Sequence, residues 1–192
     1  LLWRLKGPRA VPREVAPMRI DFLIPAHNEA AVIREKIANC FALSNSFGHD
    51  LRVTVISDGS SDGTVEAARS VDDPRLTVIE TPGRLGKLGA LNMALDRLTG
   101  DVVVFSDANA LLSHSTLDAL SRHFADPKVG GVCGQITIDE DDEGAIAKAD
   151  GAYWRYDQAL KRAESDLGGT VSAQGSIYAV RRALTAPIPP GV

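Results

Sequence analysis

Short apolar runs alternate with longer stretches whose apolar residues recur at helical spacing, and this alternation continues along most of the chain. The apolar runs predict strands at Arg19–Pro25, Leu51–Ser57, Arg75–Glu80, Val102–Phe105, Gly130–Ile138 and Ser172–Val180. The stretches between them predict helices at Asn28–Leu43, Asp62–Ser70, Leu85–Leu98, Ser113–Phe124 and Gly144–Glu164. Strands and helices in this order predict an α/β fold with a mostly parallel, helix-covered sheet.

Composition narrows the class of protein. The 192 residues suffice for one domain with a sizeable core, and 44% hydrophobic with 24% charged residues are typical of a soluble globular chain. A net charge of −4 provides no basic footprint, so we expect no nucleic-acid partner. Cys40 and Cys133 lack metal-ligand spacing and are predicted to be reduced core thiols, as in a cytoplasmic protein. No apolar stretch approaches the roughly 20 residues that cross a bilayer, so this piece is expected to be soluble.

The two ends differ in composition from the rest. Residues 1–17 are predicted to form a basic, proline-rich linker, and residues 18–192 the folded domain. Two interpretations of the linker are open: a disordered terminus, or the cytoplasmic flank of a transmembrane helix upstream of residue 1. On the second, the full-length protein lies at the cytoplasmic face of a membrane, held by segments outside this chain. The abrupt proline-rich end leads us to expect that the domain continues beyond Val192.

Polar side chains follow the predicted strand Val102–Phe105 directly. Asp107 and Asn109 are two residues apart, so on an extended backbone they point the same way. Carboxylate and amide oxygens suit Mg²⁺ or Mn²⁺ better than zinc, and such cations usually bridge phosphates. The alternative is that both residues are turn formers at the end of a strand.

Two further polar clusters end predicted strands. Pro25-Ala26-His27-Asn28-Glu29 follows the first, and Asp58 follows the second. Ligands of parallel sheets gather outside these carboxyl ends, so a nucleotide is a candidate occupant, and Asp58 is placed to accept the N–H of a pyrimidine ring. The alternatives are that Asn28 caps a helix and that Asp58 belongs to a turn. Asp62 is best interpreted as a helix cap.

A glycine-containing loop precedes the third predicted helix. Arg84 and Lys87 lie beside glycines at the helix start, where backbone N–H groups and cations together suit a phosphate. The pattern is neither a Walker loop nor the dinucleotide fingerprint, which disfavours a P-loop enzyme or a dehydrogenase. Solvated basic residues on a loop remain the alternative.

Five segments in this order resemble the family 2 glycosyltransferases, which are inverting, nucleotide-sugar-dependent enzymes with the GT-A fold. They span nearly the whole chain from Met18 onward. Each segment alone is weak evidence for the resemblance, but five of them in the family's order are strong evidence. The segments are Ile24–Glu29, Ser57–Thr64, Gly86–Asn92, Phe105–Asn109 and Gln174–Arg182. The resemblance implies a Rossmann-like three-layer sandwich with a mostly parallel central sheet.

The resemblance also implies roles for individual residues. Positions that match the family's nucleotide site are Pro25, Ala26, Asn28, Glu29, Asp58, Lys87, Asn92, Asp107 and Ala108. Asp107 and Asn109 occupy the place of the family's Asp-x-Asp metal motif. Asn109 departs from that motif, because it keeps an oxygen ligand but removes a charge, which weakens metal binding.

The acceptor side and the general base follow the acidic motif in this family. The residues that match the acceptor side are Gln174, Gly175 and Ser176, whereas Arg181 and Arg182 are interpreted as a solvated strand end. Inversion needs a general base, which in the family is an aspartate beyond this segment. No residue after Gln174 is acidic, so the catalytic residue is unknown and expected beyond Val192. The acidic run Asp139–Asp142 is interpreted as a solvated loop.

The predicted function is therefore transfer of a sugar, with inversion, from a nucleotide-sugar donor to a glycan or lipid acceptor. The resemblance favours a UDP-sugar as donor and a divalent cation, Mg²⁺ or Mn²⁺, as cofactor. Because the base is missing, this piece is expected to bind the donor but to transfer sugar poorly. Two alternatives stay open: a nucleotidyltransferase, and a non-catalytic nucleotide-sugar-binding domain.

Overall fold

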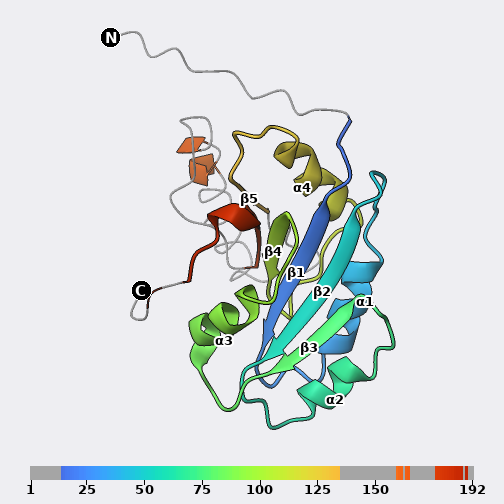
Figure 1. Ribbon diagram of the computed structural model, residues 1–192. Helices are drawn as coiled ribbons and strands as arrows, with labels where there is room; N and C mark the ends of the chain where they lie inside the picture. The colour runs from blue at the N-terminus through green and yellow to red at the C-terminus, as the bar shows by residue number, and fades with distance from the viewer. Residues whose placement is uncertain (1–13, 135–158, 162, 165–175, 188, 190–192) are drawn as a thin grey trace, which may run out of the picture.

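The computed structural model describes residues 14–134, 159–161, 163–164, 176–187 and 189 (Figure 1). Its strands are β1 (Arg19–Ala26), β2 (Asp50–Ser57), β3 (Leu76–Glu80), β4 (Val102–Ser106), β5 (Gly131–Cys133) and β6 (Ile177–Arg181). Its helices are α1 (Ile33–Phe41), α2 (Thr64–Arg69), α3 (Gly86–Leu95), α4 (Thr116–Phe124) and the short 3₁₀ helix η1 (Arg182–Leu184).

The strands form one six-stranded sheet in the order β3-β2-β1-β4-β6-β5. Strands β1, β2, β3 and β4 are parallel to one another, whereas β6 runs antiparallel to both of its neighbours, β4 and β5. The chain builds the sheet outward from β1 to β3 and then returns to place β4 on the other side of β1. The carboxyl ends of β1 and β4 therefore border the point where the strand order reverses, which is where open α/β sheets bind ligands.

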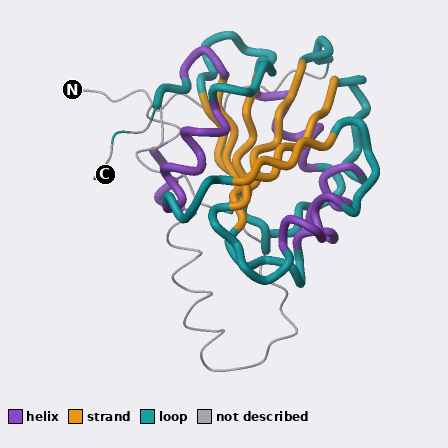
Figure 2. Tube along the Cα trace, turned by 60° about the horizontal axis from the view of Figure 1, so that its bottom comes forward, coloured by secondary structure: helices purple, strands orange, loops and turns teal. Residues whose placement is uncertain are grey.

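Alternating side chains of the strands supply two cores, one on each face of the sheet. Phe22 and Ile24 pack with helices α1, α2 and α4 on one face. Leu23 and Phe105 pack with helix α3 on the other. Figure 2 shows the strands as a layer between the helices. The predicted three-layer α/β sandwich with a mostly parallel sheet is confirmed.

Helix α1 begins five residues later than predicted. Asn28 has a positive φ of 56°, a left-handed conformation that asparagine tolerates, and the N-cap of α1 is Val32 instead. Its side-chain oxygen accepts the backbone N–H of Ser61 at 2.9 Å rather than an N–H of α1. The interpretation of Asn28 as the cap of this helix is therefore wrong, because a neighbouring loop takes its side chain.

Arg181 and Arg182 are not a solvated strand end. The Arg181 guanidinium donates to the carbonyls of Phe124, Asp126 and Val129, which follow the end of α4 or close it. Arg182 donates to the carbonyl of Leu95 at 3.0 Å, at the end of α3. The last carbonyls of a helix lack partners within the helix, and two neighbouring arginines supply partners for two helices here.

Several predicted features lie outside the described residues. They are residues 1–13 of the proposed linker, the ends of two predicted strands at 135–138 and 172–175, the acidic run at 139–142 and most of the predicted helix Gly144–Glu164. The described residues of that helix, 159–161 and 163–164, are helical. Within the described ranges, every helix is too short or too polar to cross a membrane.

Candidate functional site

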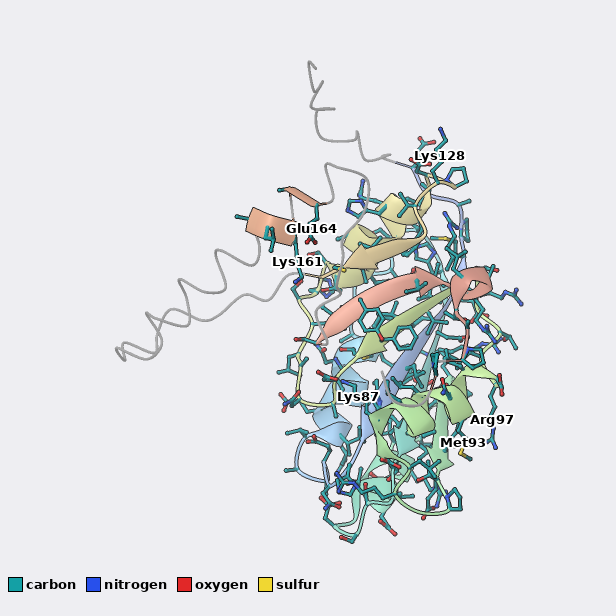
Figure 3. The ribbon with its side chains drawn as sticks, turned by 90° about the vertical axis from the view of Figure 1, so that its left-hand side faces the viewer. Lys87, Met93, Arg97, Lys128, Lys161 and Glu164 are labelled. Carbon is teal, nitrogen blue, oxygen red and sulfur yellow. The ribbon has the colours of Figure 1, made fainter. Side chains whose placement is uncertain are left out.

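The candidate site lies at the carboxyl ends of β1, β2 and β4, beside the start of α3. These elements bring together Asn28 after β1, Asp58 after β2, Asp107 after β4 and Lys87 in the first turn of α3. Figure 3 shows Lys87 at the end of α3 that lies beside the carboxyl end of β4 and the start of β6, and Arg97 beyond the opposite end of α3. The parallel pairing of β1 with β2 and β4 brings the three strand ends to one edge of the sheet. The ion pair between Lys87 and Asp107 adds the start of α3 to that edge.

The alternation of β4 sends its last residues to opposite faces of the sheet. The Ser106 hydroxyl lies on the face covered by α1, where it accepts a hydrogen bond from Lys36 at 2.8 Å. The next residue, Asp107, pairs with Lys87 of α3 across 2.7 Å. One lysine from each helical layer therefore contacts the segment that carries the predicted metal ligands.

The donor set at the end of β4 fits a hard divalent cation. Asp107 supplies a partly exposed carboxylate, and Asn109 is exposed. Residues 108–109 form a turn, in which the Ala110 N–H donates to the Asp107 carbonyl at 3.3 Å, so the predicted extended backbone between the two ligands is wrong. In the part of the chain that the structure describes, no three His, Cys, Asp or Glu side chains cluster as a complete metal site. Two protein oxygens would leave positions for water and for phosphate oxygens, which is how Mg²⁺ is commonly bound beside a nucleotide.

The β1–α1 loop is held by the loop that follows β2. The backbone N–H of Asn28 donates to the Ser60 hydroxyl at 3.1 Å, and that of Glu29 donates to the Thr64 hydroxyl at 2.8 Å. The Asp62 carboxylate accepts the N–H of Thr64, the first residue of α2, and also that of Ala30. The N-cap of α2 is Gly63, so the prediction that Asp62 is the cap is wrong by one residue. Asp62 precedes the cap, accepts the first N–H of the helix and also fixes the neighbouring loop. These bonds lower the pKa of the Asp62 carboxyl, with the Thr64 hydroxyl contributing most.

Asp58 lies buried at the base of the site. Its Oδ1 accepts the backbone N–H of Leu85, just before α3, at 2.6 Å. The Thr81 hydroxyl lies 3.5 Å from the same oxygen. Both contacts use one carboxylate oxygen, so Asp58 ties β2 to the start of α3 while its second oxygen takes no part in them. The sequence placed Asp58 at this edge but did not reveal this structural role.

Sequence reasoning missed a contact between His27 and Arg84. The His27 Nδ1 lies 2.7 Å from the carbonyl oxygen of Asp58, and its Nε2 lies beside a guanidinium nitrogen of Arg84. A guanidinium only donates, so Nε2 accepts and the proton sits on Nδ1. The imidazole therefore links the loop after β1 with the glycine loop before α3. Strand spacing alone could not have shown this link, because 57 residues separate the two side chains.

Lys36 is the second residue that sequence reasoning missed. It lies in α1, is fully buried and donates to the Ser106 hydroxyl and to the Ala110 carbonyl. Burial lowers the pKa of the Lys36 ammonium, and the nearby Cys40 and Asp107 oppose that shift. Burial also raises the pKa of the Cys40 thiol to about 11. A lysine in an amphipathic helix is expected to be exposed, so its burial becomes visible only in the fold.

The remaining predicted site residues divide into three groups. Ala26 and Ala108 have buried side chains, and Pro25 is half-buried in β1, so their backbone is the part that a ligand would meet. Ser176 lies beside the metal segment, because its carbonyl accepts the Asp107 N–H at 3.3 Å. Gln174 and Gly175 lie outside the described residues.

Asn92 stands apart from the other predicted nucleotide contacts. It lies in the seventh position of α3 and lines a small pocket with Asp96, Arg182 and Thr185. Arg182 pairs across the sheet near the start of β4, opposite the carboxyl end that carries Asp107. The nucleotide-binding role of Asn92 stays a prediction.

The sheet order and the strand ends that it brings together define an α/β domain of the GT-A type. The family model described as Glycosyl transferase family 2 matches residues 21–186, so the chain belongs to glycosyl transferase family 2. The resemblance of the five motifs to that family is confirmed.

Known relatives cover nearly all of this chain. It is 29% identical over 194 residues to an N-acetylglucosaminyltransferase of Rhizobium meliloti (strain 1021), covering 96% of this chain and 45% of that protein. It is 27% identical over 169 residues to an N-acetylglucosaminyltransferase of Rhizobium sp. (strain N33), covering 85% and 37%. The chain thus spans less than half the length of these two relatives.

Solved structures agree with the fold. The mannosyltransferase PcManGT from Pyrobaculum calidifontis, solved with GDP-Man and Mn²⁺, is 32% identical with a TM-score of 0.76, over 94% of this chain and 49% of that one. Glucosyl-3-phosphoglycerate synthase from Mycobacterium tuberculosis, solved with Mn²⁺, UDP and glucosyl-3-phosphoglycerate, is 24% identical with a TM-score of 0.57, over 87% and 58%. The second likeness supports the GT-A fold alone.

Proposed function

We propose that this chain binds the donor of a glycosyltransferase: a nucleoside-diphosphate sugar together with a divalent cation, Mn²⁺ or Mg²⁺. The observation that carries the proposal is the Lys87–Asp107 pair, with Asn109 two residues on, at the point where the strand order reverses. A cation and oxygen ligands at that edge are what a metal-bridged diphosphate needs. Family membership and the Mn²⁺ in the PcManGT structure support the same assignment.

We propose uridine as the nucleoside of the donor, and guanosine is the alternative that the GDP-Man complex of PcManGT supports. Asp58 lies at the end of β2 with one carboxylate oxygen outside its internal bonds, where it would accept the ring N–H of uracil. The structure at 32% identity holds GDP-Man, and guanine also presents a ring N–H to a carboxylate. Binding measurements with both nucleotides decide between them.

The reaction that fits the family is sugar transfer with inversion at the anomeric carbon. When bound, the cation would stabilise the negative charge of the departing diphosphate. Lys87 would hold a phosphate oxygen, and Asp107 and Asn109 would orient the diphosphate. Ser176, which is bonded to Asp107, would lie on the acceptor side. We propose a glycan or lipid as the acceptor and the cytoplasmic face of a membrane as the location of the full-length protein.

Calorimetry of nucleotide binding tests this function. UDP and GDP are titrated into the protein with Mn²⁺, with Mg²⁺ and with a chelator, for the wild type and for Asp107→Ala. We expect one nucleotide to bind tightly with metal, and Asp107→Ala to bind it no better than the wild type does in chelator. Asp72→Ala, which removes an exposed carboxylate between α2 and β3, is the matched control and should bind like the wild type.

Failure to bind either nucleotide with metal, in a folded protein, would refute the proposal. Tight binding that is independent of metal would refute the role of Asp107 and Asn109 while leaving a nucleotide site.

A further inference from the structure

Lys36 contacts the metal-binding segment from beneath. Its side chain is fully buried between α1 and the sheet. The ammonium donates to the hydroxyl of Ser106 at 2.8 Å and to the backbone carbonyl of Ala110. Asp107, Ala108 and Asn109 are the three residues between these two partners. One nitrogen therefore holds both ends of the segment that carries the predicted metal ligands.

The bonds around Ser106 have a fixed direction. An ammonium has no acceptor, so the Ser106 hydroxyl must accept from Lys36 and direct its own proton elsewhere. It donates to the carbonyl of Ser176 at 3.0 Å, and the same carbonyl accepts the Asp107 N–H. A continuous set of hydrogen bonds thus joins α1, the end of β4 and the start of β6 beneath Asp107.

Packing alone does not explain a lysine at this position. Lysine is almost never fully buried unless it is paired, and an apolar side chain of the same length would fill the space without desolvating a charge. Among the described residues, no carboxylate forms an ion pair with Lys36, and its two partners both border the Asp107–Asn109 segment.

We propose that Lys36 is a positioning residue that holds Asp107 and Asn109 in the geometry that the cation requires. This inference rests on the proposed function, because it assigns a cause to the placement of those two ligands. Mg²⁺ demands near-ideal octahedral geometry, so a small shift of either ligand weakens its binding. Loss of a group that orients metal ligands typically reduces metal affinity about 10- to 100-fold.

The test compares variants that remove or keep the bonds around Ser106. Lys36→Met keeps most of the length of the side chain but removes the ammonium. Ser106→Ala removes one hydrogen-bond partner of Lys36 and replaces Lys36→Met in the test if that variant does not fold. Ser106→Thr keeps the hydroxyl. Ile37→Val is the matched control, because it alters a fully buried neighbour in α1 that belongs to the hydrophobic core.

Two measurements are made on each folded variant. Calorimetry measures the affinity for UDP and GDP with Mn²⁺ and with chelator. Hydrogen exchange measures the protection of the backbone amides of residues 107–110, with the amides of β2 as a reference for global stability. The second measurement requires no ligand, so it is independent of the proposed function.

We expect Lys36→Met and Ser106→Ala to lose about 10- to 100-fold of the Mn²⁺-dependent affinity, with unchanged affinity in chelator. We also expect the amides of residues 107–110 to exchange faster in these two variants than in the wild type, while the exchange of the β2 amides is unchanged. Ser106→Thr and Ile37→Val should behave like the wild type. Wild-type affinity and exchange in Lys36→Met would overturn the inference and leave the proposed function intact. If the wild type itself shows no Mn²⁺-dependent binding, the proposed function fails, and the positioning role of Lys36 fails with it.

Discussion

The Lys87 ammonium lies 2.7 Å from Oδ1 of Asp107, which joins the first turn of α3 to the end of β4. Both side chains are partly exposed, at 55% and 34%, so water screens the pair and its contribution to stability is small. An exposed ion pair at a ligand edge is better placed to exchange partners than to stabilise the fold. A diphosphate that approached with a cation could take Lys87 while the cation took Asp107.

Lys87→Met should therefore weaken nucleotide binding far more than it changes stability. A hydrogen bond from a charged donor contributes about 1.5–3 kcal/mol, so we expect a loss of UDP or GDP affinity on the order of 10- to 100-fold. The free energy of unfolding should change by less than about 1 kcal/mol. Calorimetry and urea denaturation measure the two effects. Lys128→Met removes an exposed lysine far from the site and should alter neither. A Lys87→Met protein that binds normally would contradict the phosphate role.

Asn109→Asp should tighten metal-dependent binding. The substitution keeps an oxygen in place and adds a negative charge two residues from Asp107, and the charge count of the ligands sets the affinity of such sites. We expect the affinity for Mn²⁺ with nucleotide to rise on the order of tenfold, the ratio that ~1.4 kcal/mol produces. Asn109→Ala, with no ligand oxygen, should lower it. A titration of Mn²⁺ at saturating nucleotide measures both, and equal affinities in all three proteins would remove Asn109 from the metal site.

The edge positions of the site were predictable because they follow local rules. A buried run that ends in Asp or Asn marks the carboxyl end of a strand, and parallel strands bring such ends together. That reasoning placed Asp58, Asp107 and Asn28 correctly at one edge. It also predicted the layers of the fold, since alternation along β1 and β4 already divides their side chains between two faces.

Long-range partners of polar side chains were not predictable in the same way. The alternative role for Asn28 was a cap of α1, yet its side chain accepts from Ser61, 33 residues away. Arg181 was expected to be solvated, yet it contacts carbonyls more than 50 residues away near the end of α4. Lys36 is the strongest case, because its two partners, Ser106 and Ala110, lie 70 and 74 residues further along the chain. Residue type and spacing predict elements, whereas these contacts depend on how the elements pack.

Gly59→Ala should destabilise the fold more than Gly48→Ala. Both glycines have a positive φ, of 61° and 68°, so both alanines carry the same backbone strain. A Cβ on Gly59 would lie 2.8 Å from the backbone nitrogen of Arg84, whereas a Cβ on Gly48 would meet nothing within 4 Å. We expect Gly59→Ala to cost about 1–3 kcal/mol more, the range seen for overpacking. Urea denaturation of both variants measures the difference in the free energy of unfolding. Equal losses of stability would show that the loop before α3 moves to accommodate the added Cβ.

His49 should make stability depend on pH. It is buried, its Nδ1 accepts the Met18 N–H at 3.1 Å, and its Nε2 has no partner. Burial lowers the pKa of His49 below its ordinary 6.5, with Asp118 opposing the shift. The unfolded chain therefore binds a proton at a higher pH than the folded one. The stabilisation is complete above about pH 6.5 and is lost as the pH falls below it, by at most about 1.4 kcal/mol per pH unit.

Urea denaturation at pH 7.5 and pH 5.5 measures this effect. We expect the free energy of unfolding of the wild type to fall between the two values and that of His49→Gln to fall less, because the variant has no proton to gain at this position. The matched control is His123→Gln, which removes an exposed histidine of α4 and should keep the wild-type dependence. If His49→Gln loses as much stability on acidification as the wild type, another group causes the pH dependence. Protonation of His49 at Nδ1 would then not destabilise the fold.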